Sequence, residues 1–147
     1  IASVSMTIEK TAAKPMELSL QDGALAALVL ARAMGVGNRD QLSQFIEQTP
    51  ALSPEALDRL RFLDPLICDM AAATDGFDTV LDIIGATVSA PTIAPIYSLL
   101  ADYIALYGKA SPEEMRFLQR FGEAIGIDRL TRAALDSAAQ ARATSLI

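Results

Sequence analysis

Apolar residues recur every three to four positions along most of the chain from residue 18 onward, which is the spacing of amphipathic helices. No segment alternates apolar and polar residues between hairpin turns, so the pattern predicts an all-α domain. Helix start and stop signals divide residues 18–147 into a compact bundle of about seven or eight helices, one domain in all. Residues 1–17 mix Ser, Thr, Lys and Pro without a period, and we expect them to form a flexible N-terminal arm.

Local signals predict where several of these helices begin and end. The first helix is expected to stop at Gly35-Val36-Gly37, where left-handed backbone costs little, and Asn38 to cap the next one. Ser53-Pro54-Glu55 predicts a cap, a first-turn proline and an acid that open a third helix. Pro65 is expected to break or kink that helix. Asp75 is expected to cap a further one.

The clearest local signal is Ser111-Pro112-Glu113-Glu114, which predicts a capping box at the start of a helix. Gly108 precedes it by a few residues and follows the last apolar residues of another helix. We therefore expect a positive φ at Gly108 and a helix that starts at Pro112.

An internal repeat becomes visible when Gly35 is aligned with Gly108, an offset of 73 residues (108 minus 35). Each copy runs through an apolar helix, a glycine turn, a capped acidic helix start and a second apolar helix. Matched pairs are Asn38 with Ser111, Asp40 with Glu113, Gln41 with Glu114, Leu42 with Met115 and Phe45 with Leu118. This predicts two helix-loop-helix units related by a pseudo-twofold axis, although any capped helix after a glycine turn looks similar.

If the two copies cover each other, they should share one core. The residues then expected to be buried are Leu28, Leu42, Phe45, Tyr103, Phe117, Leu118, Phe121 and Ile125. Tyr97, Tyr103 and Tyr107 lie on one predicted helix and are expected at the core and its rim.

The stretch from Ala101 to Met115, with its Tyr-Gly-Lys-Ala-Ser-Pro-Glu-Glu turn, resembles the TerB-like proteins of tellurite resistance and the related N-terminal region of DjlA-type co-chaperones. The likeness continues from Phe117 to Ile127 and is weaker in the first copy around Gly35. It implies a compact helical bundle, a binding or scaffold role linked to tellurite or metal stress, and, for some members, divalent metal bound by acidic groups at the turns.

The acidic motifs of that family are degenerate in this chain. The family's Asp before the glycine is replaced by Tyr107 in one copy and by Met34 in the other, and neither is a hard oxygen ligand. Asp40, Glu113 and Glu114 are the acids that remain at matching positions, so they are the metal ligands that the resemblance implies. Their alternative role is to stabilise helix N-termini against the macrodipole.

Composition excludes several kinds of chemistry. The chain has no histidine, which removes His-based catalytic triads, histidine general bases and His-containing zinc sites. Its one cysteine, Cys68, leaves no internal disulfide or CxxC motif, and it is expected to be a buried inert thiol. A net charge of −6 argues against nucleic-acid partners.

The negative charge is concentrated in one central segment. No Lys or Arg lies between Phe62 and Gly108, whereas six Asp residues do. Among them Asp75, Asp78 and Asp82 stand at i, i+3 and i+7, so they project from one helix face. Their mutual repulsion would be relieved by a cation, Ca²⁺ or Mg²⁺, or by a basic partner; an ordinary solvated face is the alternative.

The chain opens at Ile1 without an initiator Met, and its longest apolar run, Ala24–Ala31, is far too short to cross a bilayer. A lone cysteine and no export signal favour the cytoplasm. The leading functional hypothesis is a non-enzymatic helical binding or scaffold module that needs no cofactor and engages a protein partner; the oligomeric state stays open. The alternatives are divalent-cation binding by the acidic face and an enzyme that uses carboxylates alone.

Overall fold

The computed structural model describes residues 18–146, and this part of the chain is all-helical, as the sequence pattern predicts. Seven α-helices and one short 3₁₀ helix account for it: α2 (Leu20–Ala33), α3 (Arg39–Glu47), α4 (Ala56–Ala72), α5 (Gly76–Gly85), η2 (Ala90–Thr92), α6 (Ile93–Tyr107), α7 (Pro112–Ile125) and α8 (Arg129–Ala143). The arm expected over residues 1–17 lies outside the described residues.

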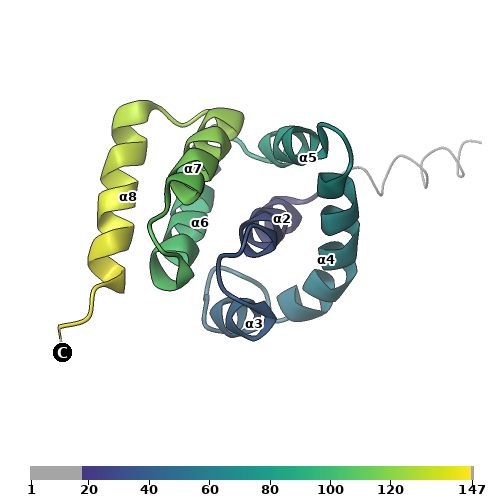
Figure 1. Cartoon of the computed structure of the whole chain (residues 1–147), viewed down its shortest axis with the longest axis horizontal. Coiled ribbons are helices and arrows are strands. Elements are labelled where there is room, and N and C mark those ends of the chain that lie inside the picture. The colour runs from purple at the N-terminus through teal and green to yellow at the C-terminus, as the bar shows by residue number, and fades with distance from the viewer. Residues whose placement is uncertain (1–17, 147) are drawn as a thin grey trace, which may run out of the picture.

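Helix α2 is the centre of the bundle. Every residue from Asp22 to Ala31 is buried, so α2 has no solvated face, as expected for a helix that is apolar nearly all round. It packs against α3, α4, α5 and α6, which surround it in Figure 1, where α2 is seen end-on. Helix α8 packs on the outer side of α6, and α7 contacts both α5 and α6.

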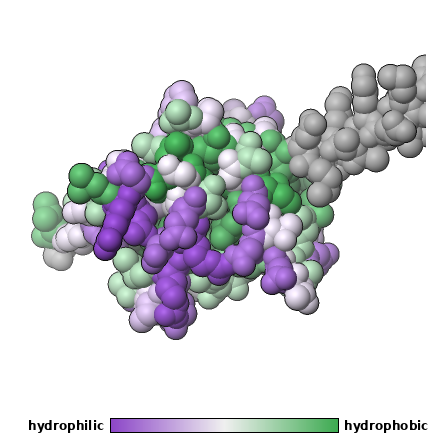
Figure 2. Space-filling view, turned by 90° about the horizontal axis from the view of Figure 1, so that it is seen from above, coloured by the Kyte–Doolittle hydropathy of each residue, from purple (hydrophilic) through white to green (hydrophobic). Residues whose placement is uncertain are grey.

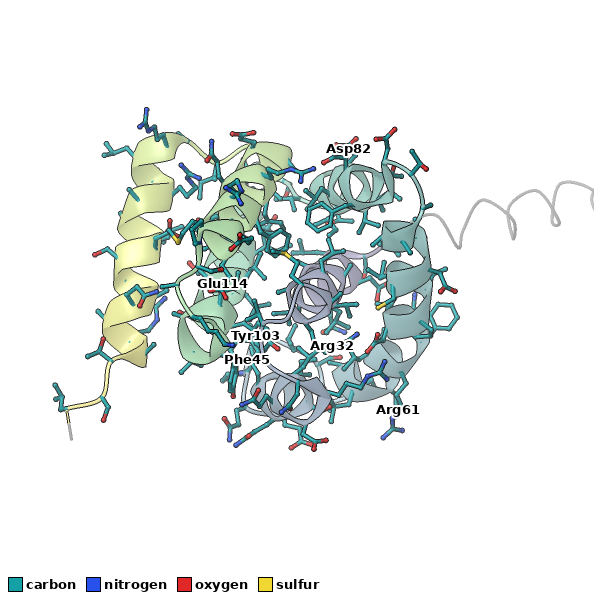
Figure 3. The ribbon with its side chains drawn as sticks, viewed as in Figure 1. Arg32, Phe45, Arg61, Asp82, Tyr103 and Glu114 are labelled. Atoms are coloured by element: carbon teal, nitrogen blue, oxygen red, sulfur yellow. The ribbon has the colours of Figure 1, made fainter. Side chains whose placement is uncertain are left out.

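One core joins the two copies of the repeat. All eight residues expected to be buried are buried, from Leu28, Tyr103 and Phe121 at 0% exposure to Phe45 at 8%. Phe45 of α3 lies edge-on to Tyr103 of α6, with ring centroids 5.2 Å apart. The Tyr103 hydroxyl donates a hydrogen bond to the Val36 carbonyl oxygen at 2.7 Å, which fixes the first glycine turn to α6. Figure 3 shows Phe45 and Tyr103 side by side between these helices.

Two predicted boundaries are wrong near α4. Ser53 does not cap the helix, because its Oγ accepts a hydrogen bond from Gln21 and its backbone N–H donates to the same amide side chain. Helix α4 begins at Ala56 without a side-chain cap. Pro65 does not end the helix, which continues to Ala72 and curves gently in Figure 1. Of the predicted break or kink at Pro65, the break is therefore wrong.

Candidate functional site

The turn between α6 and α7, which carries the family-like motif, is built around the buried side chain of Glu114. The Ser111 hydroxyl accepts a hydrogen bond from the Glu114 backbone N–H at 3.2 Å, and Pro112 is the first residue of α7, as predicted. The Glu114 carboxylate does not close a capping box onto Ser111. It accepts the Lys109 backbone N–H at 3.0 Å on each oxygen instead, so this acid fastens the turn.

The positive φ in this turn lies at Ala110 (54°), whereas Gly108 is extended (φ −87°, ψ 178°), so the prediction for Gly108 is wrong. Glycine is needed at Gly108 for space. A Cβ there would lie 2.4 Å from Glu114 Oε1 and 2.5 Å from the Ile104 carbonyl oxygen. In the first copy Gly37, which aligns with Ala110, is also left-handed (φ 70°). The two turns therefore share their left-handed residue just before the helix cap.

The other two acids implied by the resemblance lie on the surface. Asp40 is exposed in the first turn of α3, and Glu113 is exposed in the first turn of α7. Glu113 pairs with Arg116 one turn later at 3.6 Å. Glu114 lies inward of both, between α7 and α6 in Figure 3, with its oxygens already engaged. Asp40 and Glu113 thus lie in the first turns of their helices, and Glu114 stabilises the α6–α7 turn through its hydrogen bonds.

The acidic face predicted on α5 exists, but it is less isolated than the sequence indicates. Asp78 forms an ion pair with Arg120 of α7, a basic residue far away in sequence. Asp75 stands at the N-cap position in a left-handed conformation (φ 57°), and its side chain makes no capping hydrogen bond, so the predicted cap is wrong. Asp82 is exposed and points away from the bundle in Figure 3.

Figure 2, which looks at the molecule from above, shows a band of hydrophilic residues with apolar residues beside it. Between residues 18 and 146, no three acidic or cysteine side chains come together in a group that could hold a metal ion.

Two part-buried ion pairs, which the sequence does not predict, join α2 to α4. Arg59 donates to both carboxylate oxygens of Asp22, at 2.8 and 3.0 Å, and this pairing lowers the pKa of Asp22. Arg32 Nη2 lies 2.8 Å from Asp64 Oδ1. Both pairs span 32 to 37 residues along the chain, so no local pattern could have revealed them.

Cys68 lies beside the second pair. Its Sγ is 3.4 Å from Asp64 Oδ1 and 3.5 Å from Arg32 Nη2. The thiol is only partly buried and borders a cavity, in contrast to the fully buried residue expected from the sequence. Desolvation, and then the neighbouring Asp64, raise the pKa of Cys68, which keeps the thiol neutral near pH 7.

The tyrosines of α6 are placed at the core and its rim, as expected. Tyr97 and Tyr103 are fully buried, and Tyr107 is half-buried. The Tyr97 hydroxyl donates to Asp136 of α8 at 2.6 Å, and burial raises its pKa. Burial also raises the pKa of Tyr103 to about 12. Both hydroxyls therefore stay protonated and act as fixed hydrogen-bond donors between elements.

An apolar groove runs along α6 beside the α3–α4 loop, and no pattern in the sequence predicts it. Two adjoining hollows of about 330 and 280 Å³ share Thr49, Pro50, Leu99 and Asp102. Together they form what we call the α6 groove, whose apolar lining is Leu20, Ala24, Phe45, Pro50, Ala51, Leu52, Pro95, Ile96, Leu99, Leu106, Ala139 and Ala143.

The floor of the α6 groove follows helical periodicity. Pro95, Leu99, Asp102 and Leu106 of α6 stand at i, i+4, i+7 and i+11. The α3–α4 loop forms one wall, and the C-terminal turns of α8 form part of the other. Arg142 of α8 pairs with Asp102 at 2.7 Å, which places a single charged pair midway along an otherwise apolar floor. Leu106 is 51% exposed, so its side chain is open to solvent at one end of this floor.

No single helix in the described part is both long and apolar enough to cross a membrane; α5 together with η2 and α6 would pass by composition, but that pair is bent by 112°. No protein-family model, curated protein or solved structure matches this chain. The geometry of the α6 groove, the acidic residues and the cavities is therefore the basis for assigning a function.

Proposed function

We propose that this chain is a non-enzymatic helical binding module that holds an amphipathic helix of a partner protein in the α6 groove. The observation that carries the proposal is the row of apolar residues left open along α6. From Pro95 to Leu106 the groove floor is about 16 Å long at 1.5 Å per residue, or roughly three helical turns. That length matches a short helix whose apolar side chains repeat every three to four residues.

Charge indicates the rest of the partner's chemistry. The chain carries a net charge of −6, so a partner helix with basic residues flanking its apolar face is attracted during encounter. Within the groove the Asp102–Arg142 pair is partly exposed, at 32% and 54%, and offers one acceptor and one donor to a polar residue midway along the bound helix. Its role is to set the register of that helix, while the leucines provide the affinity.

The TerB-like resemblance supports the same class of function, a helical scaffold, and the link to tellurite or metal stress rests on that resemblance alone. Divalent-cation binding by Asp75, Asp78 and Asp82 is the weaker alternative, because Arg120 already neutralises Asp78. Calorimetric titration with Ca²⁺ and Mg²⁺ tests the alternative. Binding that is lost in the Asp78→Asn, Asp82→Asn double variant would establish it.

A designed probe peptide tests the proposal. The peptide is a fluorescein-labelled amphipathic helix with leucine at i, i+3, i+4 and i+7 and lysine elsewhere, and its binding is followed by fluorescence anisotropy. Leu106→Lys places a charge in the groove and removes apolar contact. We expect it to weaken binding about tenfold or more, since burial of one leucine contributes roughly 1.5–3 kcal/mol.

Leu130→Lys is the matched control. Leu130 is 82% exposed on α8 and does not line the α6 groove, so this variant changes the net charge by the same amount. It should bind the probe as the parent does. Equal weakening by both variants would show that the peptide responds only to the net charge of the protein. No binding of the peptide to the parent protein at about 100 µM would contradict the proposal.

A further inference from the structure

A further cavity, separate from the α6 groove, lies between α3 and α4 and is lined by more basic than acidic side chains. This α3–α4 cavity has a volume of about 370 Å³, within the range of small-molecule sites. Arg39 and Arg61 line it, and Arg32 lies behind it, bonded to Asp64 and Cys68 of its wall. Of the charged residues that line the cavity, two are arginines and one is an acid, Asp64. Asp64 is already paired with Arg32, so Arg39 and Arg61 leave the lining positive in a chain whose net charge is −6.

The arginine side chains at this cavity make few or weak interactions with other protein groups. Within residues 18–146, Arg39 has no hydrogen-bond or ion-pair partner. Arg61 pairs with Asp58 at 3.2 Å, but both side chains are 80% exposed, and such pairs contribute little. Arg32 is nearly buried and gives Asp64 only one hydrogen bond, and its Nε has no partner at all. Figure 3 shows Arg32 directed from α2 toward α4 and Arg61 on the outer side of α4.

The remaining lining provides complementary groups. The Ser43 hydroxyl borders the cavity and has no partner in the described part of the chain, so it is free to donate. Asp64 Oδ1 accepts from Arg32 and Cys68, which leaves Oδ2 to accept a hydroxyl proton. Leu42, Leu60 and Pro65 supply apolar surface. Because the Cys68 thiol is neutral, it adds no negative charge to the cavity.

We infer that the α3–α4 cavity binds a small organic phosphate monoester. Arginine forks match phosphate oxygens, and several donors converging on one cavity suit a compact group with three terminal oxygens. A phosphate monoester carries close to two negative charges at neutral pH, so it can pair with both Arg39 and Arg61. Its organic part, with a hydroxyl group, would lie against Leu42 and Leu60 and donate to Asp64 Oδ2. The cavity is too large for inorganic phosphate alone to fill.

The test uses the single cysteine as a reporter. Because Cys68 is the only cysteine and borders the cavity, its rate of alkylation by N-ethylmaleimide, followed by mass spectrometry, reports whether the cavity is occupied. The probes are glycerol 3-phosphate, inorganic phosphate, succinate, and potassium chloride at matched ionic strength. Thermal unfolding with each probe gives a second readout, since a ligand of the folded state raises the melting temperature.

We expect glycerol 3-phosphate to slow the alkylation and raise the melting temperature, with weaker effects from inorganic phosphate and succinate. Arg39→Gln and Arg61→Gln should each weaken the effect about tenfold, the value expected for one charge-assisted hydrogen bond. Arg116→Gln is the matched control, because Arg116 forms a similarly exposed i,i+3 pair, with Glu113 on α7. It should leave the response unchanged.

Four results would overturn the inference. No protection by glycerol 3-phosphate at about 10 mM would exclude useful affinity. An equal loss in all three arginine variants would show a response to net charge only. Equal binding of inorganic phosphate would remove the role of the organic part, and equal binding of succinate would remove the preference for phosphate. None of these results bears on the α6 groove, which shares no lining residue with this cavity.

Discussion

At the scale of single residues, the motif turn shows how one glycine can be required for a reason that the sequence does not reveal. A glycine after a helix predicts left-handed backbone, yet Gly108 has a φ that any residue adopts. The left-handed residue is Ala110, two positions later. The burial of Glu114, whose carboxylate occupies the space beside the Gly108 Cα, is the cause, and burial of an acid is not readable from local sequence.

Two substitutions in this turn test the steric requirement at Gly108 separately from the left-handed backbone at Ala110. Ala110→Gly should stabilise the protein by about 0.5–1 kcal/mol, because it relieves a left-handed alanine at a modest cost in unfolded-chain entropy. Gly108→Ala should destabilise it by more than about 1 kcal/mol, because the new Cβ would overlap the Ile104 carbonyl oxygen. Urea unfolding measures both changes. A stabilising Gly108→Ala would contradict the steric explanation.

Of the four helix caps predicted from the sequence, the structure confirms two. Asn38 and Ser111 both accept the backbone N–H that is three residues ahead, because capping of this kind depends only on neighbouring residues. The other two predicted caps, Ser53 and Asp75, are wrong, the first because of a tertiary contact and the second because of its backbone conformation. Ser53 is engaged by Gln21 of α2, and Asp75 is left-handed, which turns its side chain out of capping geometry.

Removing a helix cap lowers the free energy of unfolding by an amount that can be predicted. Ser111→Ala should lower the free energy of unfolding by about 1 kcal/mol, because the Glu114 N–H loses its acceptor. Asn38→Ala should cost a similar amount in the first copy of the repeat, where the Gln41 N–H is the donor. Thermal or urea unfolding of both variants makes the comparison. An unchanged midpoint in either one would show that water replaces the cap at no cost.

At the scale of elements, the chain predicts which segments are helical better than how they are joined. Seven helices lie where apolar periodicity places them, but α4 runs through Pro65, where the sequence predicts a break or kink. The reason is that α2 and α5 pack along α4 and hold both halves in line. The packing of α2 on α4 also brings together the part-buried Asp22–Arg59 and Arg32–Asp64 pairs. Partners more than 30 residues apart create these features, so a local pattern cannot show them.

The pairing between α2 and α4 predicts a pH dependence. The pKa of Asp22 is lower in the folded protein than in the unfolded chain, chiefly because of its hydrogen bonds with Arg59. The stabilisation from this carboxylate is therefore fully present above the unfolded pKa near 3.8 and is lost as the pH falls through the folded value. Asp22→Asn should destabilise the protein at pH 7 by about 1–3 kcal/mol and flatten the fall in stability below pH 4.

The measurement is urea unfolding of the parent and Asp22→Asn between pH 7 and 2.5. Asp58→Asn is a suitable control, because Asp58 pairs with Arg61 in an 80% exposed pair on the same helix as Arg59. Its pH profile should follow that of the parent. If Asp22→Asn and the parent lose stability in parallel below pH 4, the pairing does not carry the acid sensitivity.

At the scale of the whole molecule, the two copies of the repeat form one core, and Tyr103 is the residue that connects them most directly. It is completely buried on α6, contacts Phe45 of α3 and donates a hydrogen bond to Val36 in the first glycine turn. Tyr103→Phe keeps the ring and leaves the Val36 carbonyl oxygen without this donor, at a cost of about 1–3 kcal/mol for a buried unsatisfied group.

Tyr107→Phe is the matched control on the same helix, because its ring also contacts Phe45 but its hydroxyl bonds no described residue, so we expect little change. Native-state hydrogen exchange then shows whether the copies are coupled. If they share one cooperative core, Tyr103→Phe should reduce the protection of amides in α2 and α7 by the same free energy, since both exchange through global unfolding. Reduced protection confined to the turn at Gly35–Gly37 would mean that the tyrosine only fastens a loop and that the two copies unfold independently.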